Sequence, residues 1–106
     1  MSDVAKPRKK EDLAVKERAT TKGPRMYKVL LHNDDFTTME FVVWILMELF
    51  NKSQTEAMQI MLHVHHKGMG VAGVYTYDMA QTKVKKVLEV AREHGHPLKC
   101  TAEPEE

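Results

Sequence analysis

The alternation of hydrophobic and polar positions first indicates short strands. Residues 26–32 are predicted to form a strand, in which every second side chain faces the same side. Residues 70–77 are rich in β-branched and aromatic side chains, and Gly73 among them predicts a close backbone approach. A last, shorter strand is expected over residues 97–101. The positions of the first strand expected to face the core are Tyr27, Val29 and Leu31.

Between these strands the apolar residues recur at helical spacing and predict three helices. The first covers about residues 38–50, the second ends at Gly68 and the third at Gly95, because glycine favours the left-handed backbone of a helix end. The predicted capping pairs are Thr37 with Glu40, Ser53 with Glu56, and Asp78 with Gln81. The expected core positions are Phe41, Val42, Ile45, Leu46 and Leu49; Ala57, Ile60, Met61 and Val64; and Ala80, Val84, Val87, Leu88 and Ala91.

The predicted order of elements is βααβαβ, which is typical of an α+β domain with a small antiparallel sheet and three helices packed on one face. A length of 106 residues fits one such domain. The segment before Gly23 and Pro24 is crowded with charges and holds few large apolar residues, so it cannot bury enough surface to order itself. We expect a flexible tail over residues 1–24, a domain over 25–103 and a short acidic tail over 104–106.

Composition narrows the classes of function. The net charge of +1 at pH 7 argues against a nucleic-acid binder that works by bulk electrostatics. Cys100 is the only cysteine, so no disulfide can form within the chain, which fits a reducing compartment. No apolar run approaches the ~20 residues of a membrane span, and the N-terminus is charged where a signal peptide would be apolar. We expect a cytoplasmic protein with no membrane partner.

The most informative candidate chemistry follows the first strand, where Asn33, Asp34 and Asp35 are neighbours. No basic residue lies between Lys28 and Lys52, so the two acids are uncompensated in the local sequence. Short polar side chains of this kind form turns by folding back on the backbone, and that role alone can account for them. The helix that follows is almost wholly apolar, however, so the acceptors lie at the mouth of an apolar slot. That arrangement suits a ligand with a cation at one end and a hydrocarbon at the other.

Other chemistry has less support in the sequence. Of the six histidines, His63 and His66 are spaced so that they could share a zinc ion, but the chain has no HExxH motif and no cysteine pair. We therefore expect no metal and no other cofactor. The sequence offers no nucleophile with a plausible base and no phosphate-binding loop, which argues against an enzyme. Trp44 is predicted on the outer face of the first helix, where it is either an ordinary surface residue or part of a contact with a partner.

A series of motifs runs in order along the predicted domain. They are Asn33-Asp34-Asp35 with Thr37, Met39, Glu40 and Phe41; Met61-Leu62 and Val64-His65 with Gly68; Gly73; Thr82-Lys83-Val84; and His96-Pro97-Leu98 with Cys100. Together they resemble the ClpS-type adaptors, which bring N-degron substrates to the Clp unfoldase and protease. The resemblance covers nearly the whole domain. It implies the βααβαβ fold and recognition of the free N-terminus of proteins that begin with Leu, Phe, Tyr or Trp.

Carried over to this chain, the resemblance implies that Asn33, Asp34 and His65 hold the α-ammonium group of the substrate. An ammonium has three donors and no acceptor, and an amide oxygen, a carboxylate and a neutral imidazole nitrogen can accept from it. Asp35 would lie at the mouth of the site. The implied side-chain pocket is walled by Thr37, Met39, Val42, Met61, Val64 and Leu98.

The resemblance also implies a partner surface on the third helix, at Asp78, Thr82 and Lys83, which would contact the unfoldase. From the residue pattern alone Asp78 is a helix cap, and one residue can serve both roles. The chain departs from the family pattern at Asp78 and Gln81, where the family more often has Glu, and at Thr38, where it usually has Pro.

The implied partners are a ClpA-like or ClpC-like AAA+ unfoldase and the substrate protein, with no nucleic acid and with the free chain a monomer. An alternative of another class is a protein-interaction domain of ribosomal-stalk-like fold. Such a domain could share the βααβαβ order, but it would not recognise N-terminal residues.

Overall fold

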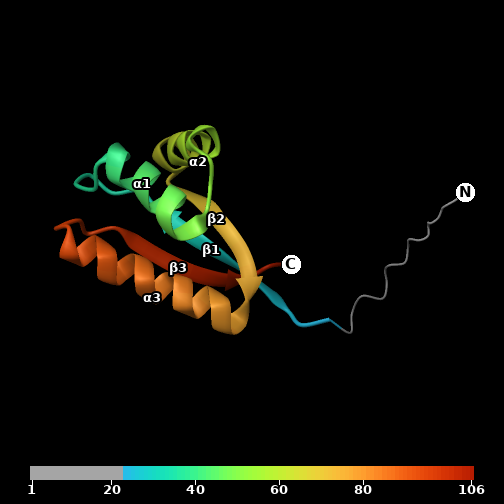
Figure 1. Ribbon diagram of the computed structural model, residues 1–106. Coiled ribbons are helices and arrows are strands. Elements are labelled where there is room, and N and C mark those ends of the chain that lie inside the picture. Colours follow the sequence, from blue (N-terminus) through green and yellow to red (C-terminus); the bar gives the residue numbers. More distant parts are fainter. Residues whose placement is uncertain (1–22) are drawn as a thin grey trace, which may run out of the picture.

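The computed structural model describes residues 23–106, and the expectations for residues 1–22 lie outside the described residues. Helices and strands follow in the predicted order, which confirms the α+β fold (Figure 1). The elements are β1 Met26–His32, α1 Met39–Phe50, α2 Gln54–Lys67, β2 Met69–Thr76, α3 Tyr77–Glu93 and β3 Lys99–Pro104. Over residues 23–106, no helix is both long enough and apolar enough to cross a membrane.

The strands form one antiparallel sheet in the order β2-β1-β3, with β1 in the centre. The pairing of β1 with β2 shifts register between Val29 and Leu30, where β2 carries Ala72 as the extra residue of a bulge. The close approach predicted at Gly73 is present, although a ring and not a backbone makes it. A Cβ at Gly73 would lie 2.5 Å from the hydroxyl oxygen of Tyr75, so any larger residue at this position would force the ring to move.

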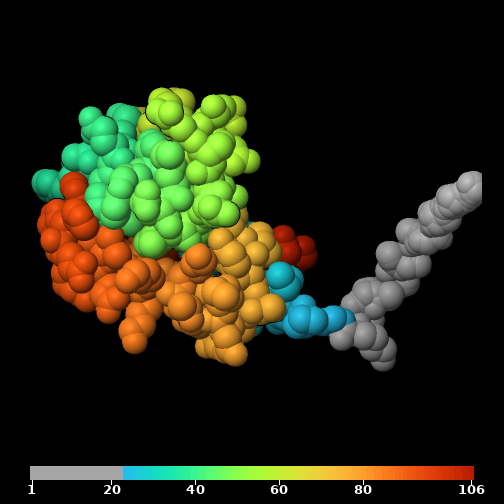
Figure 2. Space-filling view, in the orientation of Figure 1, coloured from blue at the N-terminus to red at the C-terminus, as the bar shows by residue number. Residues whose placement is uncertain are grey.

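One hydrophobic core joins the sheet to all three helices. Val29 and Leu31 of β1 are fully buried in it, as predicted, and Tyr27 packs partly against it. Leu30, which lies on the opposite face of the strand, is also buried, with 4% exposure, so the middle of β1 is covered on both faces. Phe50 and Val90 are buried although the pattern did not predict them. The predicted core positions that are only partly buried are Leu49, Ile60, Val84 and Leu88. Figure 2 shows the outer surfaces of α1 and α3, in green and orange, meeting on one side of the molecule.

The start of α1 differs from the prediction by one residue. Its N-cap is Thr38, whose hydroxyl oxygen accepts a hydrogen bond from the Phe41 N–H at 3.1 Å. The capping box predicted for Thr37 and Glu40 is therefore wrong. The physical reason is that the Thr37 hydroxyl donates to the carboxylate of Asp34 at 2.7 Å, so the preceding turn uses it before the helix begins.

The predicted caps at both ends of α2 are present, whereas the cap predicted for α3 is not. The capping box of α2 is confirmed, because Ser53 and Glu56 each accept a hydrogen bond from the other's N–H, at 3.1 and 3.0 Å. Gly68 is the C-cap of α2 with φ of 95°, as predicted. The cap predicted at Asp78 is wrong. Since α3 follows β2 directly, Thr76 is its N-cap and Asp78 lies within the first turn.

The end of the chain also differs in its bounds. The last strand was expected over residues 97–101, whereas β3 covers Lys99–Pro104 and pairs with β1 as far as Tyr27 opposite Pro104. The Glu105 N–H then donates to the Met26 carbonyl at 2.8 Å. The length of β3 is set by its pairing with β1, and the local sequence of β3 does not predict that pairing. Pro104, predicted as tail, is therefore part of the sheet.

Candidate functional site

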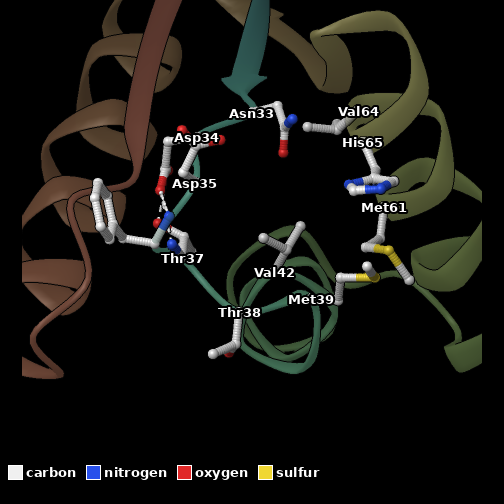
Figure 3. Close-up of a pocket in the computed structure, with 11 residues that line it drawn as sticks. Asn33, Asp34, Asp35, Thr37, Thr38, Met39, Val42, Met61, Val64 and His65 are labelled. Atoms are coloured by element: carbon white, nitrogen blue, oxygen red, sulfur yellow. Dashed lines mark hydrogen bonds between the residues drawn. The ribbon is translucent and has the colours of Figure 1, made fainter.

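A pocket of about 360 Å³ opens where β1 ends, between the loop that follows it and the helices α1 and α2 (Figure 3). One side of the pocket is polar and comes from the loop, and the other is largely apolar and comes from the helices. Its lining residues are Asn33, Asp34, Asp35, Phe36, Thr37, Thr38, Met39, Val42, Met61, Val64 and His65.

The loop is fastened to α2 at its first residue. The Asn33 N–H donates to the Gly68 carbonyl at 2.8 Å, and Gly68 is the residue that ends α2. His65 lies in the last turn of the same helix. In Figure 3 the Asn33 amide and the His65 ring are near each other at one end of the pocket. This bond therefore holds the loop of Asn33 beside the last turn of α2, which carries His65.

Asp34 is held by the loop that it begins. Its Oδ1 accepts hydrogen bonds from the N–H groups of Phe36 and Thr37 at 2.8 and 2.7 Å, and its Oδ2 accepts from the Thr37 hydroxyl. Partial burial alone would raise the pKa of the Asp34 carboxyl. The hydrogen bonds from Thr37 and Phe36, together with the nearby His96, outweigh it and hold that pKa below its ordinary value. Asp34 is thus a fixed carboxylate that accepts three hydrogen bonds and has the capacity to accept one more.

The apolar side of the pocket consists of buried and half-exposed residues. Val42, Met61 and Val64 are buried, while Met39 is 46% exposed. Met61 and His65 lie one turn apart on α2 and both border the pocket, as their spacing predicts. In Figure 3 the side chains of Met39 and Met61 lie next to each other on the wall below His65. A cation placed between the acceptors could therefore carry its hydrocarbon part onto the methionines.

The structure brings nearly all the predicted site residues together. Phe36 and Thr38 also line the pocket, although the sequence offered no signal for them beyond their place in the loop. Leu98 is different: it is 4% exposed in the core and borders another hollow, with Leu88 and Arg92. The predicted residues that line the pocket are Asn33, Asp34, Asp35, Thr37, Met39, Val42, Met61, Val64 and His65.

The predicted partner surface lies on the first turns of α3. Asp78 is exposed, and its carbonyl accepts a hydrogen bond from the Thr82 hydroxyl at 3.0 Å. Lys83 is engaged within the fold. Its ammonium group donates to the Leu49 carbonyl at the end of α1 and lies 5.7 Å from the ring centroid of Tyr75. Lys83 therefore supplies a positive charge to the C-terminus of α1.

The remaining candidate groups of the sequence are surface or core residues. Trp44 is exposed as predicted, and its ring lies 5.3 Å from that of His94. Burial raises the pKa of the Cys100 thiol to about 12, so this thiol is neutral and poorly reactive. Among residues 23–106, no group of three or more His, Cys, Asp or Glu side chains is placed to hold a metal ion.

Comparison with known proteins gives consistent results. The family model of the ATP-dependent Clp protease adaptor protein ClpS matches residues 22–101. The chain is 58% identical over 95 residues to the ClpS adapter protein of Hyphomonas neptunium, a match that covers 90% of this chain and 80% of that protein. It is 61% identical over 85 residues to the ClpS adapter protein of Myxococcus xanthus, covering 80% and 79% of the two chains.

A solved structure is also similar, that of Agrobacterium tumefaciens ClpS2 bound to L-phenylalaninamide. The TM-score is 0.76 and the sequence identity 40%, and the match covers 78% of this chain and 100% of that one. The likeness thus extends over the fold that positions the pocket.

Proposed function

This chain belongs to the ClpS family of ATP-dependent Clp protease adaptor proteins, and on that premise we propose that it binds the free N-terminal residue of its substrates. The preferred N-terminal residues are Leu, Phe, Tyr and Trp, and the bound protein is delivered to a Clp AAA+ unfoldase for degradation. The ribosomal-stalk-like alternative is not favoured, since the family match covers residues 22–101.

The observation that carries this proposal is the joining of ammonium acceptors and an apolar wall in one pocket. Asn33, Asp34 and His65 border the same 360 Å³ as Val42 and Met61. We assign the α-ammonium group to the three polar residues. Hydrogen bonds that involve a charged group contribute roughly 1.5–3 kcal/mol each, so two or three of them discriminate a free amine from a blocked one.

The apolar wall accounts for the choice of side chain. Burying a Leu or Phe side chain contributes roughly 1.5–3 kcal/mol, and the methionines can adapt to several shapes because they are unbranched and flexible. The L-phenylalaninamide bound by the Agrobacterium tumefaciens relative has this chemistry, a free amine beside an aromatic side chain. Set against the cost of association, these contributions predict a dissociation constant of about 1 μM or somewhat tighter.

Fluorescence anisotropy with labelled peptides tests the proposal. A peptide that begins with Leu should bind, whereas the same peptide beginning with Ser should bind at least about tenfold more weakly, because Ser buries little apolar surface. Acetylation of the Leu peptide should reduce binding as much or more, since it removes the charge and two donors. Equal binding of the acetylated and free peptides would show that the α-amino group is not recognised.

Delivery requires a second surface, which we propose to be the start of α3. Asp78 does not cap the helix, and its exposed carboxylate is free to meet a basic group of a ClpA-like or ClpC-like unfoldase. Thr82 lies one turn further along the same helix. Lys83 contributes to this surface mainly through its stem, since its ammonium group holds the end of α1. We propose that the free chain acts as a monomer.

A further inference from the structure

A second hollow lies directly beside the substrate pocket, between α1 and the start of α2. Its volume is about 380 Å³, similar to that of the pocket itself. Met39 and Met61 border both spaces. The residues that line this second hollow are Met39, Glu40, Val43, Gln54, Met58 and Met61.

The two methionines therefore form the wall that separates the spaces, as their adjoining side chains in Figure 3 illustrate. Met61 is 6% exposed and Met39 is 46% exposed, so one is anchored in the core and the other has room to move. Methionine has three rotatable bonds in its side chain and no branch, which lets it change shape at low cost.

A wall of this kind matters because protein interiors tolerate little extra volume. Forcing additional atoms into a packed site moves side chains off their rotamers and destabilises the complex. When the wall has an unfilled space behind it, its side chains can yield without that penalty. The indole ring of Trp needs more room than the side chain of Leu, so the space behind the wall matters most for Trp.

We propose that the second hollow receives the ends of the Met39 and Met61 side chains when the pocket holds a large aromatic N-terminal residue. The hollow thereby sets the preference for Trp relative to Leu. Val43, Gln54 and Met58, which line only the hollow, become specificity-determining residues although they do not border the substrate pocket. This inference rests on the proposed function and adds a mechanism for its breadth of side chains.

The experiment fills the hollow from two different helices. Val43→Phe adds a ring from α1 and Gln54→Trp adds one from the exposed first residue of α2. Both variants should bind a Trp-initiated peptide about tenfold more weakly than the wild type does and bind a Leu-initiated peptide within about twofold of it. The matched control is Met47→Phe, one turn beyond Val43 on α1 and 38% exposed, which should change neither affinity.

Val43→Ala separates filled volume from loss of the native side chain, and it should bind the Trp peptide at least as well as the wild type. A fall in Trp affinity in this variant would overturn the inference. So would an unchanged ratio of Trp to Leu affinity in folded Val43→Phe and Gln54→Trp, with folding checked by thermal unfolding. If Val43→Phe does not fold, Gln54→Trp decides, since an exposed helix start tolerates it. Wild-type protein that bound neither peptide would instead refute the proposed function.

Discussion

The hydroxyl group of Thr37 should contribute measurably to substrate affinity by holding the carboxylate of Asp34 in place. Thr37→Val keeps the branched shape of the side chain and removes the hydroxyl that donates to Asp34 Oδ2 at 2.7 Å. The two backbone donors to Asp34 Oδ1 stay in place. The helix cap is also untouched, because Thr38 provides it. The variant thus isolates one of the three bonds that fix the carboxylate.

The expected magnitude follows from the strength of that bond. Hydrogen bonds to charged groups contribute roughly 1.5–3 kcal/mol, and partial exposure of Thr37 places this one at or below the lower end. Part of that loss reaches the ligand, because a carboxylate held by two bonds instead of three is less ordered before binding. We expect Thr37→Val to bind a Leu-initiated peptide about fivefold more weakly. Asp34→Ala, which removes the charged acceptor itself, should weaken binding by at least about tenfold.

The acid titration supplies a second readout with a defined sign. The pKa of Asp34 is lowered in the folded protein. The ionised carboxylate therefore adds to the free energy of unfolding above the pKa of the unfolded chain, and this contribution is lost as the pH falls through the pKa of the folded protein. Thr37→Val removes the largest of the lowering contacts, and the pKa of Asp34 should move up. Carboxylate NMR titration measures this shift, while anisotropy at neutral pH measures affinity.

The neighbouring cap is the control for this prediction. Thr38 also lines the pocket, but its hydroxyl oxygen already accepts from the Phe41 N–H and makes no bond to Asp34. Thr38→Val should therefore lower the free energy of unfolding by about 1 kcal/mol through loss of the cap and leave peptide affinity within about twofold. If Thr37→Val bound the Leu peptide as tightly as the wild type while Asp34→Ala did not, the hydroxyl would have no part in presenting the acid. The reasoning that joins the turn to ligand affinity would then be refuted.

Three further predictions concern other parts of the molecule. Met39→Ala should improve binding of an Ile-initiated peptide and leave a Leu-initiated one unchanged or weaker, because we expect the wild-type side chain to clash with a branch at the ligand's β-carbon; equal Leu-to-Ile ratios in mutant and wild type would exclude this role. Deletion of residues 1–24 should leave peptide affinity within error and impair delivery in a degradation assay, whereas a large loss of binding would place the segment at the pocket. Lys83→Met should reduce the free energy of unfolding by about 1 kcal/mol, seen in a denaturant titration, because the Leu49 carbonyl loses its charged donor.

Local patterns predicted the order and type of the elements, and they failed where two local patterns competed. Ser53 and Glu56 form the predicted box because both partners lie within four residues and no other group claims them. Thr37 matches the same box with Glu40, yet its hydroxyl bonds to Asp34. Because the Thr37 hydroxyl is bonded within the turn, Thr38 caps the helix. The sequence of the helix alone does not predict this outcome.

The site was predictable to the extent that it is built from short segments. The predicted residues that line the pocket all come from two stretches, residues 33–42 and 61–65. The positions of Leu98 and Lys83 depend on contacts across the fold. The ammonium group of Lys83 bonds to a carbonyl 34 residues away, and no local pattern distinguishes such a lysine from a solvated one.

Contacts within the loop, and between the loop and α2, preorganise the pocket before a ligand binds. The acceptors that we propose come from separate elements, Asp34 from the loop and His65 from α2, so the loop and the helix must be held in a fixed relative position. The bond from Asn33 N–H to the Gly68 carbonyl provides that link at the point where β1 leaves the sheet and α2 ends. The polar end of the pocket is thus fixed by backbone and short side chains, which cost little entropy to order on binding. The apolar end is left to Met39 and Met61, which remain adaptable. The proposed ammonium site would thus be rigid and its apolar wall deformable, which is the arrangement expected of a protein that requires a free N-terminus and accepts several large side chains.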